Sequence, residues 1–505
     1  MEKLFIFSIV FLIIPANAFV INNSEILQND CGADEDIIYV GGTGPNNYSS
    51  IQSAINDADD GHTIFVYNGT YLENILIDKQ LHIIGENKND TIIDGGGIGN
   101  IVDFSADSIN FCNFTIQHSG VEFANSGVIF NSNKCSLTNV IIIKTYWAIY
   151  LTHFSERNEI KNNLISNNTR GIYSFTGSKF NFISFNTIIN NIYSGIFFYA
   201  TEGNIIERNI LNSNGNGVVI DFADNNLISQ NKITNNTYSG IILIDSSNYN
   251  QVSNNFISDH YLSGIYLGDN SSHNNISYNY INLNEDGIGF ENSQFNIIFN
   301  NLISSNSDSG ISLTESSQNL IEKNTILESN NYGLYLYDSD NNMIDSNNII
   351  RNDKYGIYLA WSNNNIIRKN LFNLNHPLHL QFRSGSNNNW VYLNNFLNNS
   401  CNISDFCNNI WDFKKKGNYW SDYEDRYPEA QKLWFRGIWD TPYDIPGGEN
   451  QDRYPLIKQC QNTLSTTFNI NNKSKKFHFN LLSYLFEKFP NVFPILRKLL
   501  IFLLF

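Results

Sequence analysis

The chain carries little charge for its length, and positive charge is the scarcer sign. Only 16% of its 505 residues are Asp, Glu, Lys or Arg, and the 31 basic residues are outnumbered by 48 acidic ones, which gives a formal charge of −17. Proteins that bind nucleic acid rely on basic side chains to neutralise phosphates. A chain this poor in Lys and Arg is therefore not expected to have a nucleic-acid partner.

Soft metal ligands are scarce as well. There are two methionines, six cysteines and nine scattered histidines. A copper site needs a cluster of Met, His or Cys, and the sequence has no such tract. We therefore predict no cofactor and no dedicated metal site, apart from a divalent cation shared by the acidic row described below.

Long apolar runs are confined to the two ends of the chain. The opening, "MEKLFIFSIVFLIIPANAFV", has a polar start, an apolar run over residues 4–14 and a small-residue site at 16–18. That run is too short to span a bilayer, so residues 1–18 are predicted to be a signal peptide and the protein to be secreted or bound at the cell surface. The tail, residues 476–505, is apolar too, and is predicted to contact a membrane interface or to dock elsewhere.

What the sequence has in abundance is one repeated phrase. "NYGLYLYDSDNNMIDSNNIIRN", residues 331–352, is followed by the near copy "KYGIYLAWSNNNIIRKNLFN". Its glycine recurs every 22 to 24 residues, at Gly171, Gly195, Gly217, Gly240, Gly264, Gly287, Gly310, Gly333 and Gly356. An asparagine that precedes an apolar pair follows each glycine, at Asn181, Asn204, Asn226, Asn250, Asn275, Asn296, Asn319, Asn342 and Asn365. A second asparagine and apolar pair follow soon after.

This period predicts a solenoid. Each repeat holds three short runs of alternating pattern with no helical periodicity, and such a unit cannot bury its own apolar face. Stacked repeats can, with their strands paired along the stack about 4.8 Å apart. We therefore predict an all-β, right-handed parallel β-helix of about thirteen or more coils. The glycine is expected to serve a turn with unusual backbone angles, and the asparagines an inward ladder of side-chain amides.

Two cysteines fit this period. Cys112 and Cys135 lie 23 residues apart, and the next steps of 23 reach the asparagine track. We therefore expect them to be stacked neighbours, either bridged or present as two buried thiols. Cys401 and Cys407 could staple a loop near the far end.

The repeat is flanked by segments of different composition. Ile51, Ala54, Ile55 and Ala58 form one helical stripe after Ser49 or Ser50, and Gly61 is expected to end that helix. The predicted parts are a signal peptide (1–18), an N-terminal cap with the first coils (37–100), β-helix repeats (101–410), an aromatic C-terminal cap (411–457), a polar linker (458–475) and the apolar tail (476–505).

The residues resemble a known group of proteins. "YSSIQSAINDADDGHTIFVYNGTYLENILIDKQLHIIGE" is similar to the start shared by pectin-esterase-like and archaeal surface β-helix proteins. The repeats, with "GNYWSDY" and the later "DTPYDIPGG" and "NQDRYPL", resemble the NosD-type β-helix family over most of residues 37–457. That family includes periplasmic copper-accessory proteins, and its wider class contains carbohydrate-binding proteins and sugar hydrolases. The resemblance is specific for the fold and implies much less about activity.

The chain departs from its relatives in three ways. The stretch "EDRYPEAQKLWFRGIW" stands where related proteins often carry an acidic, glycine-rich calcium loop. The ligands that a copper role requires are scarce. The catalytic phrases of pectin esterases and alginate epimerases are missing. The resemblance to those enzymes therefore stops at the scaffold.

One outward row is expected to be aromatic. Two residues after each repeat glycine, and after Ala148, which stands one period before Gly171, side chains should point to solvent. Six of these positions carry rings: Tyr150, Tyr173, Phe197, Tyr266, Tyr335 and Tyr358. A flat row of rings suits sugar faces. The alternative is that the rings only stabilise the sheet as cross-strand pairs.

The next row is acidic. Four or five residues after the glycine lie Asp221, Asp245, Asp269, Glu291, Glu315 and Asp338. Carboxylates on consecutive coils repel one another, so some should hold protons more tightly or share a cation. Paired carboxylates also perform glycoside hydrolysis, which makes these six the catalytic candidates. The alternative is that acidic residues serve turns at strand ends.

Three functional classes follow. The favoured one is a non-enzymatic surface protein that binds or scaffolds a polysaccharide or cell-surface glycan on this aromatic and acidic face. The second is a polysaccharide hydrolase or lyase that uses the stacked carboxylates. The third is a structural envelope protein without a ligand, or a NosD-like copper accessory protein.

Overall fold

A computed structural model describes residues 37–383, 385–398 and 403–460 of the chain. The predicted signal peptide, Cys401, most of the polar linker and the apolar tail lie outside these residues. Neither helix in the described part is long and apolar enough to cross a membrane.

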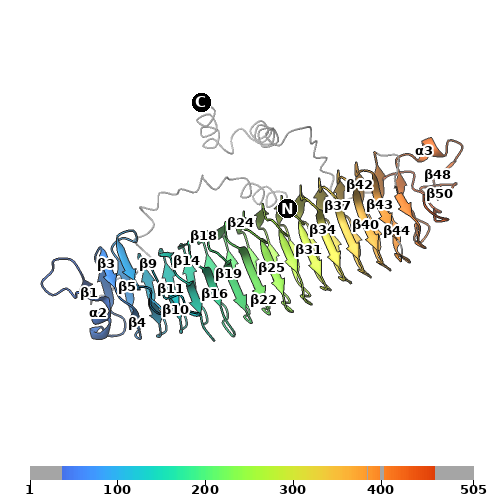
Figure 1. The fold of residues 1–505 in the computed structure, drawn as a ribbon. Helices are drawn as coiled ribbons and strands as arrows, with labels where there is room; N and C mark the ends of the chain where they lie inside the picture. The colour runs from blue at the N-terminus through green and yellow to red at the C-terminus, as the bar shows by residue number, and fades with distance from the viewer. Residues whose placement is uncertain (1–36, 384, 399–402, 461–505) are drawn as a thin grey trace, which may run out of the picture. The chain divides into compact units, whose positions relative to one another are not determined.

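Three long sheets account for nearly all of the strands (Figure 1). Sheet 1 contains β1 (Ile37–Val40), β2 (Thr63–Val66), β5 (His82–Gly85), β8 (Asn110–Cys112), β11 (Ser136–Thr138), β14 (Glu159–Lys161), β17 (Phe182–Ser184), β20 (Ile205–Glu207), β23 (Leu227–Ser229), β26 (Gln251–Ser253), β29 (Asn275–Ser277), β32 (Ile297–Phe299), β35 (Leu320–Glu322), β38 (Met343–Asp345), β41 (Ile366–Arg368) and β44 (Trp390–Tyr392). Sheet 2 contains β4 (Ile75–Ile77), β7 (Val102–Phe104), β10 (Ser126–Phe130), β13 (Trp147–Leu151), β16 (Arg170–Ser174), β19 (Ser194–Tyr199), β22 (Asn216–Asp221), β25 (Ile241–Ile244), β28 (Ile265–Leu267), β31 (Ile288–Glu291), β34 (Ser309–Thr314), β37 (Tyr332–Tyr337), β40 (Tyr355–Ala360), β43 (Leu378–Phe382) and β46 (Ile403–Asp405). Sheet 3 contains β3 (Gly69–Leu72), β6 (Thr91–Asp94), β9 (Thr115–Gln117), β12 (Ile141–Ile143), β15 (Leu164–Ser166), β18 (Thr187–Ile189), β21 (Ile210–Asn212), β24 (Lys232–Thr234), β27 (Phe256–Ser258), β30 (Tyr280–Asn282), β33 (Leu302–Ser304), β36 (Thr325–Leu327), β39 (Asn348–Ile350), β42 (Leu371–Asn373), β45 (Asn395–Leu397) and β47 (Tyr419–Trp420).

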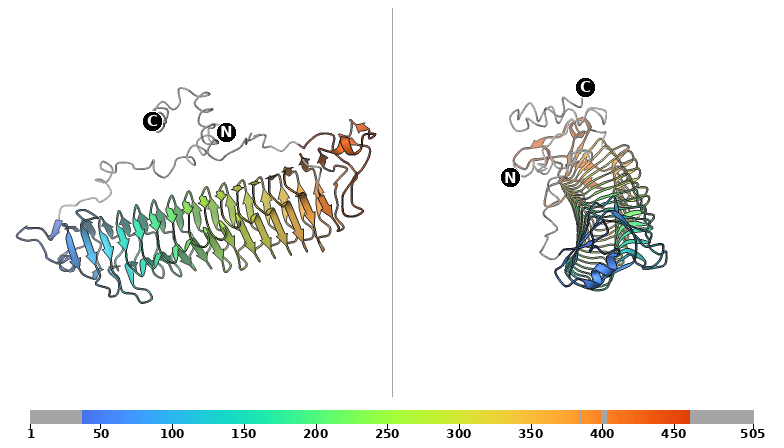
Figure 2. Two further views of the ribbon diagram at one scale, coloured as in Figure 1. Left: turned by 45° about the horizontal axis from the view of Figure 1, so that its top comes forward. Right: turned by 90° about the vertical axis from the view of Figure 1, so that its left-hand side faces the viewer.

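Each coil contributes one strand to each sheet, and the chain returns to the same sheet one period later. Pairing within the sheets is parallel, and a residue meets its equivalent in the next copy, as Tyr335 does with Tyr358 between β37 and β40. Seen along the stack, the coils superpose (Figure 2). The predicted all-β parallel β-helix is therefore confirmed, with sheets of 16, 15 and 16 strands. Its right-handed sense stays a prediction.

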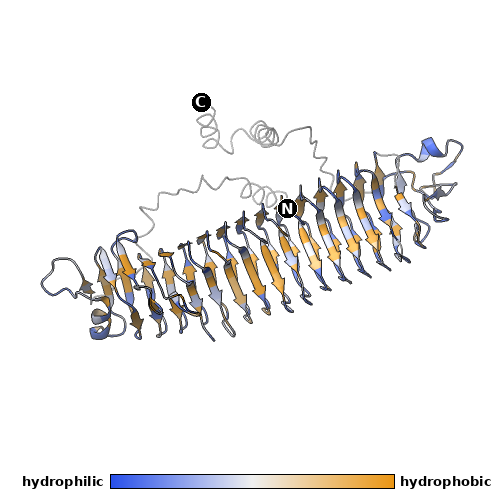
Figure 3. Cartoon of the chain, in the orientation of Figure 1, coloured by the Kyte–Doolittle hydropathy of each residue, from blue (hydrophilic) through white to orange (hydrophobic). Residues whose placement is uncertain are grey.

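The bore of the solenoid is filled by aliphatic side chains. At the first and third positions after each repeat glycine the side chains are fully buried, as Leu334 and Leu336 show in β37. The strands are accordingly apolar, whereas the turns between them are polar (Figure 3). Burial of this continuous apolar column is the main force that holds the stack together, because no single coil has a core of its own.

Stacked asparagines line all three corners of the coil. In each ladder, the backbone N–H of one member donates to the Oδ1 atom of its equivalent in the next coil, as Asn319 does to Asn342 at 2.8 Å. The ladder between sheets 2 and 1 contains Asn158, Asn181, Asn204, Asn226, Asn250, Asn274, Asn296, Asn319, Asn342, Asn365, Asn389 and Asn409. The predicted track is confirmed with one correction. In this coil the ladder residue is Asn274, whereas Asn275 is the exposed first residue of β29.

The other two ladders follow the same rule. The ladder between sheets 1 and 3 runs from Asn163 to Asn418. The third ladder, between sheets 3 and 2, was not recognised from the sequence, because a histidine and a serine interrupt its asparagines. It contains Asn168, Asn191, Asn214, Asn236, His260, Asn284 and Asn306, and, farther along, Ser329, Asn352 and Asn375.

The repeat glycines are needed for close approach, which corrects the expectation of an unusual turn. The φ angles of the repeat glycines lie outside the left-handed region. Most residues of the stack that do have left-handed φ angles are not glycines, such as Lys323, which precedes the ladder residue Asn324. A Cβ atom added at Gly333 would stand 2.5 Å from the Gly356 carbonyl oxygen and 2.8 Å from Asn352 Nδ2. Glycine therefore lets consecutive backbones pack at this corner.

The cysteine prediction is wrong in one respect. Cys135 does lie on the first ladder track, where its N–H donates to Asn158 Oδ1 at 2.9 Å. Cys112, however, is level with Thr138 in sheet 1, so the two cysteines are not stacked neighbours. The coil is 26 residues long at this point, because Ser136 stacks on Asn110 in the strand register. In the same way, Cys135 Sγ accepts from the N–H of Ile109, 26 residues earlier. The sequence spacing of 23 was a coincidence.

A short helix lies at the N-terminal end of the stack. Helix α2 (Ile51–Asp57) begins after Ser50, whose side chain accepts from Ser53 N–H, and the Glu73 carboxylate accepts from the first backbone N–H groups. A carboxylate here offsets the positive end of the helix. Ile51, Ala54 and Ile55 join the core as predicted. The helix ends at Asp57 with Ala58 as its C-cap, before Gly61.

At the other end an aromatic segment follows the last coil. It contains α3 (Tyr423–Arg426) and two hairpins, β48 (Lys432–Leu433) with β49 (Ile438–Trp439) and β50 (Tyr443–Asp444) with β51 (Gln451–Asp452). Trp420 stacks on Tyr443 with ring centroids 4.1 Å apart. Asp452 accepts from Asn418 N–H at 2.7 Å, so a carboxylate terminates the second asparagine ladder.

Candidate functional site

The outer surface of sheet 2 carries the predicted aromatic row. The strand register aligns Tyr150, Tyr173, Phe197, Val219, Ile242, Tyr266, Gly289, Ser312, Tyr335 and Tyr358, one residue per coil. These side chains lie outside the bore, because the residues on either side of them fill it. The row exists as predicted, but its members differ in what covers them.

The N-terminal members of the row belong to a small second core. Tyr150 and Tyr173 are only 8% and 7% exposed, and they pack with Trp147 and Ile129. The rings of Trp147 and Tyr173 stack 4.2 Å apart, and Phe197 borders the same cluster. These three row residues stabilise the sheet by cross-strand contact, and Tyr150 and Tyr173 present little surface to a ligand.

The C-terminal members form an accessible group of four rings. Tyr332, Tyr335, Tyr355 and Tyr358, here termed the tyrosine cluster, are all half-buried and come from β37 and β40. Tyr335 stacks on Tyr358 with centroids 5.6 Å apart, and Tyr332 stacks on Tyr355 at 5.5 Å. Tyr332 and Tyr355 precede the repeat glycines and were not among the predicted residues. The tyrosine that recurs before glycine in "NYG" and "KYG" is the sequence signal that indicates them. The two stacked pairs are tilted by 50–59° to each other, and together they form one compact aromatic patch.

Small residues separate this cluster from the next ring of the row. Gly289 and Ser312 stand between Tyr266 and Tyr335 in the register. Tyr266 donates from its hydroxyl to Glu291 Oε2 at 2.6 Å, which holds its ring on one side. The row thus presents a ring, two small residues and then the tyrosine cluster.

An aspartate that was not among the candidates lies beside these small residues. Asp286 is in the coil of Gly289, and its Oδ1 atom accepts from Ser309 N–H at 3.0 Å. Burial, and secondarily the nearby Asp308 carboxylate, raise the pKa of Asp286 to about 7. Asp308 itself accepts from the Asn331 side-chain amide. Two carboxyl groups from consecutive coils therefore stand together next to the tyrosine cluster, and Asp286 holds its proton more tightly than an exposed aspartate does.

The predicted acidic row does not form one straight line. Asp221 and Glu291 are the last residues of β22 and β31. The other four lie one position later, in turns, where all have left-handed φ angles and are exposed: Asp245, Asp269, Glu315 and Asp338. Their position fits the turn role of acidic residues.

One pair within the acidic row does interact. Asp221 is half-buried, and burial, followed by repulsion from Asp245, raises its pKa to about 6. Its Oδ1 atom is buried and has no hydrogen-bond partner among the described residues. The pair confirms the expectation that neighbouring coils bring carboxylates into contact, at a single step of the stack.

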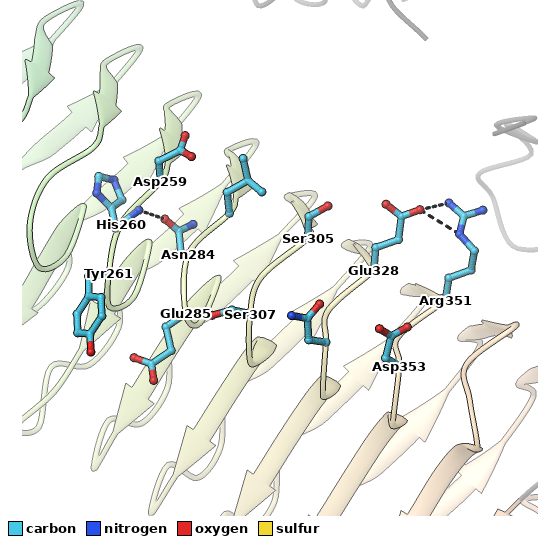
Figure 4. Close-up of a pocket in the computed structure, with 12 residues that line it drawn as sticks. Asp259, His260, Tyr261, Asn284, Glu285, Ser305, Ser307, Glu328, Arg351 and Asp353 are labelled. Carbon is cyan, nitrogen blue, oxygen red and sulfur yellow. Dashed lines mark hydrogen bonds and ion pairs between the residues drawn. The ribbon is translucent and has the colours of Figure 1, made fainter. Parts of the chain in front are cut away.

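A groove runs along the corner between sheets 3 and 2, and one of its lining residues, Glu285, directly precedes Asp286 in the chain. Its volume is about 960 Å³, and it crosses five coils (Figure 4). Its lining residues are Asp259, His260, Tyr261, Leu283, Asn284, Glu285, Ser305, Ser307, Glu328, Asn330, Arg351 and Asp353. Four carboxylates thus face one guanidinium, and that group is already paired, since Arg351 Nη2 donates to Glu328 Oε1 at 2.6 Å. His260 is neutral near pH 7, because burial lowers its pKa to about 4. The groove is therefore negative.

The donor sets of the described residues do not fit a copper ion. No three His, Cys, Asp or Glu side chains among residues 37–383, 385–398 and 403–460 converge as metal ligands. Met343 lies beside the guanidinium of Arg368, His260 is buried in the third ladder, and His379 is buried in β43. Copper favours clustered thioether, thiolate and imidazole groups. The copper role that the family resemblance implies finds no ligand cluster here.

Comparison with solved structures finds matches at low sequence identity. The DFA-IIIase of Arthrobacter chlorophenolicus A6 is 15% identical, with a TM-score of 0.43 over 62% of this chain and 94% of that one. An alginate lyase from Paenibacillus sp. str. FPU-7 is 14% identical, with a TM-score of 0.37 over 48% and 94%. The Dettilon tailspike protein is 14% identical, with a TM-score of 0.41 over 73% and 70%. No curated protein matches the sequence.

Family models give the assignment. The model described as "Right handed beta helix region" matches residues 96–257 and 179–326. The model described as "Periplasmic copper-binding protein (NosD)" matches residues 262–425, which include the last repeats and the "NYWSDY" element. Together with the coil-by-coil register, these matches identify the chain as a NosD-type β-helix repeat protein.

Proposed function

We propose that the protein is exported and binds a polysaccharide on the outer surface of sheet 2, at the tyrosine cluster. The observation that carries the proposal is the stacking of four half-buried rings from two consecutive coils on an outward face. Aromatic faces pack well against the C–H faces of sugar rings, while hydroxyl groups find polar partners at the edges.

Polar partners stand where such a ligand would need them. Asp286, Asp308 and Asn331 lie in three consecutive coils, the last of which carries Tyr332. Because coils repeat about every 4.8 Å along the stack, a ligand that extends along the axis meets equivalent positions in register. A linear glycan fits such a surface better than a compact ligand does.

The charge of this region selects among glycans. The groove beside the cluster carries Asp259, Glu285, Glu328 and Asp353 against a paired Arg351. A surface of one sign repels ligands of the same sign. The ligand is therefore a neutral or amino-bearing polysaccharide, and not a polymer of uronic acids.

A binding screen on the full chain tests the proposal. Neutral, amino-bearing and uronate polysaccharides are immobilised, and retention is measured for the wild type and for a Tyr335→Ala/Tyr358→Ala variant. The expected result is retention by the wild type and a loss of at least about tenfold in the variant. The matched control is Tyr249→Ala/Phe295→Ala, which removes two exposed rings that stack on either side of His273 at another corner.

The same screen separates the remaining functions. If no polysaccharide retains the wild type, the binding proposal fails and a structural envelope role is favoured. If the control variant loses retention as much as the tyrosine variant does, the binding surface lies elsewhere on the stack.

Asp286 supports a second candidate, a polysaccharide hydrolase or lyase. A carboxyl group whose pKa is raised to about 7, beside a second carboxyl group, is the kind of pair that cleaves glycosidic bonds by acid and base catalysis. The test scores new reducing ends and unsaturated products from any polysaccharide that is retained. Products that disappear in Asp286→Asn, with retention unchanged, would make the protein an enzyme. Products that depend on Asp245 or Asp269 would place catalysis in the acidic row instead.

A further inference from the structure

The C-terminal segment has an exposed aromatic tip that the carbohydrate surface does not use. Strands β48 and β49 form an antiparallel hairpin, and residues 434–437, here termed the hairpin tip, connect them. Trp434 is 64% exposed and Phe435 is fully exposed. The other tryptophans of this segment, Trp411, Trp420 and Trp439, are buried. Two large apolar side chains are thus exposed side by side on one turn.

The hairpin is firmly held at its base, so the tip is presented in a defined position. Trp439 stacks on Tyr423 with centroids 4.7 Å apart. The Lys432 ammonium pairs with Glu424 at 2.8 Å and lies 4.8 Å from the Trp439 ring centroid. The turn closes through Arg436 N–H, which donates to the Leu433 carbonyl at 2.9 Å. A rigid base under an exposed aromatic tip is suited to insertion rather than to enclosing a ligand.

The last described residues pass this hairpin and end at β45. Ile457 N–H donates to the Gly437 carbonyl at 3.1 Å. Three residues later, Cys460 is held by two hydrogen bonds with the Asn395 side chain, at 2.8 and 3.0 Å. Residues 461–505 follow, and their sequence ends in the apolar stretch "FPILRKLLIFLLF". An apolar segment with Arg and Lys is typical of sequences that associate with a lipid interface.

We propose that the hairpin tip inserts into the interface of a lipid bilayer and orients the solenoid on it. Tryptophan rings favour the headgroup level of a membrane, and phenylalanine favours the apolar layer just below. Arg436 is exposed, forms no ion pair among the described residues, and stands next to Phe435, where a guanidinium meets lipid phosphates. A bilayer is the occupant that explains both the exposed apolar tip and the apolar sequence that follows Cys460.

Vesicle binding by the full chain tests this proposal. The protein is mixed with vesicles of phosphatidylcholine and phosphatidylglycerol, some of which contain brominated acyl chains that quench nearby tryptophans. Bound wild-type protein is expected to show quenching, and Trp434→Phe is expected to remove most of it, because the other tryptophans of this segment are buried. Quenching that is unchanged in Trp434→Phe would overturn the proposal, as would the absence of binding.

A partition measurement separates the tip from the tail. The Trp434→Ser/Phe435→Ser variant is expected to bind vesicles at least about tenfold more weakly than the wild type. The matched control is Phe154→Ser/Phe222→Ser, which removes two exposed aromatic residues from turns along the stack. Equal binding by the wild type and the tip variant would mean that the tail alone attaches the protein. If the tip variant instead abolishes self-association in lipid-free solution, the occupant is a second copy of the chain and the bilayer proposal fails.

Discussion

At the residue scale, the stack depends on positions where only one size of side chain fits. A Cβ atom at Gly333 would meet backbone of the next coil at 2.5 Å, and the backbone at that point cannot move without shifting its neighbours. Gly333→Ala is therefore expected to destabilise the protein by about 1–3 kcal/mol. Chemical denaturation measures the change. The control is Ser312→Ala, on the outer surface of the same sheet, and an equal loss in both variants would contradict the close-packing explanation.

A second residue-scale prediction concerns the histidine in the third ladder. His260 replaces an asparagine between Asn236 and Asn284, and its buried Nε2 atom has no hydrogen-bond partner among the described residues. His260→Asn restores the repeat and removes an unsatisfied buried group, so it is expected to stabilise the protein by about 0.5–2 kcal/mol. A lower melting temperature in the variant would show that the imidazole packs better than an amide here.

The pH dependence gives His260 an independent signature. Burial lowers its pKa from 6.5 to about 4, so the folded state resists protonation more than the unfolded state does. The stability that depends on the neutral ring is therefore complete above pH 6.5 and is lost as the pH falls toward 4. This part of the acid sensitivity should be absent in His260→Asn, as a pair of denaturation series at several pH values would show.

At the element scale, the sequence predicts what repeats and misses what varies. The period, the three strands per coil and the first asparagine ladder are legible because each coil repeats them. The third ladder is obscured because His260 and Ser329 interrupt it, and the tyrosine cluster because two of its rings precede the glycine rather than follow it. The predicted stacking of Cys112 on Cys135 is wrong because one early coil is 26 residues long, and spacing alone cannot reveal that insertion.

The raised pKa of Asp286 makes the free energy of unfolding depend on pH. Its pKa is raised to about 7 in the folded state, so below that value the folded protein holds a proton that the unfolded chain has released. Stability from this group is complete below the unfolded pKa near 4 and is lost as the pH rises toward 7. Asp286→Asn mimics the protonated form, and its stability should fall less than that of the wild type between pH 4 and pH 7. Parallel curves for the two proteins would contradict the raised pKa.

At the scale of the whole molecule, charge decides which polymer the stack can approach. The chain has a formal charge of −17, and four groove carboxylates stand against one paired arginine. At 0.1 M salt, interactions between exposed charges are screened over about 10 Å. The attraction or repulsion between the groove and a charged polymer must therefore depend on ionic strength. Binding of an amino-bearing polysaccharide should weaken as salt is added, that of a neutral one should change little, and that of a uronate polymer should be weakest at low salt.

Titrations of the three polymers at rising sodium chloride measure this order. Replacing Glu285 and Asp353 with Gln and Asn removes two groove charges and leaves the tyrosine cluster intact, so it should weaken the amino-bearing polymer several-fold and leave the neutral one unchanged. The same change at Glu315 and Asp338, which are exposed turn residues of the outer rows, is the matched control. Tight uronate binding at low salt would mean that the ligand contacts a surface other than the groove, because a negative groove cannot attract a negative chain without a cation between them.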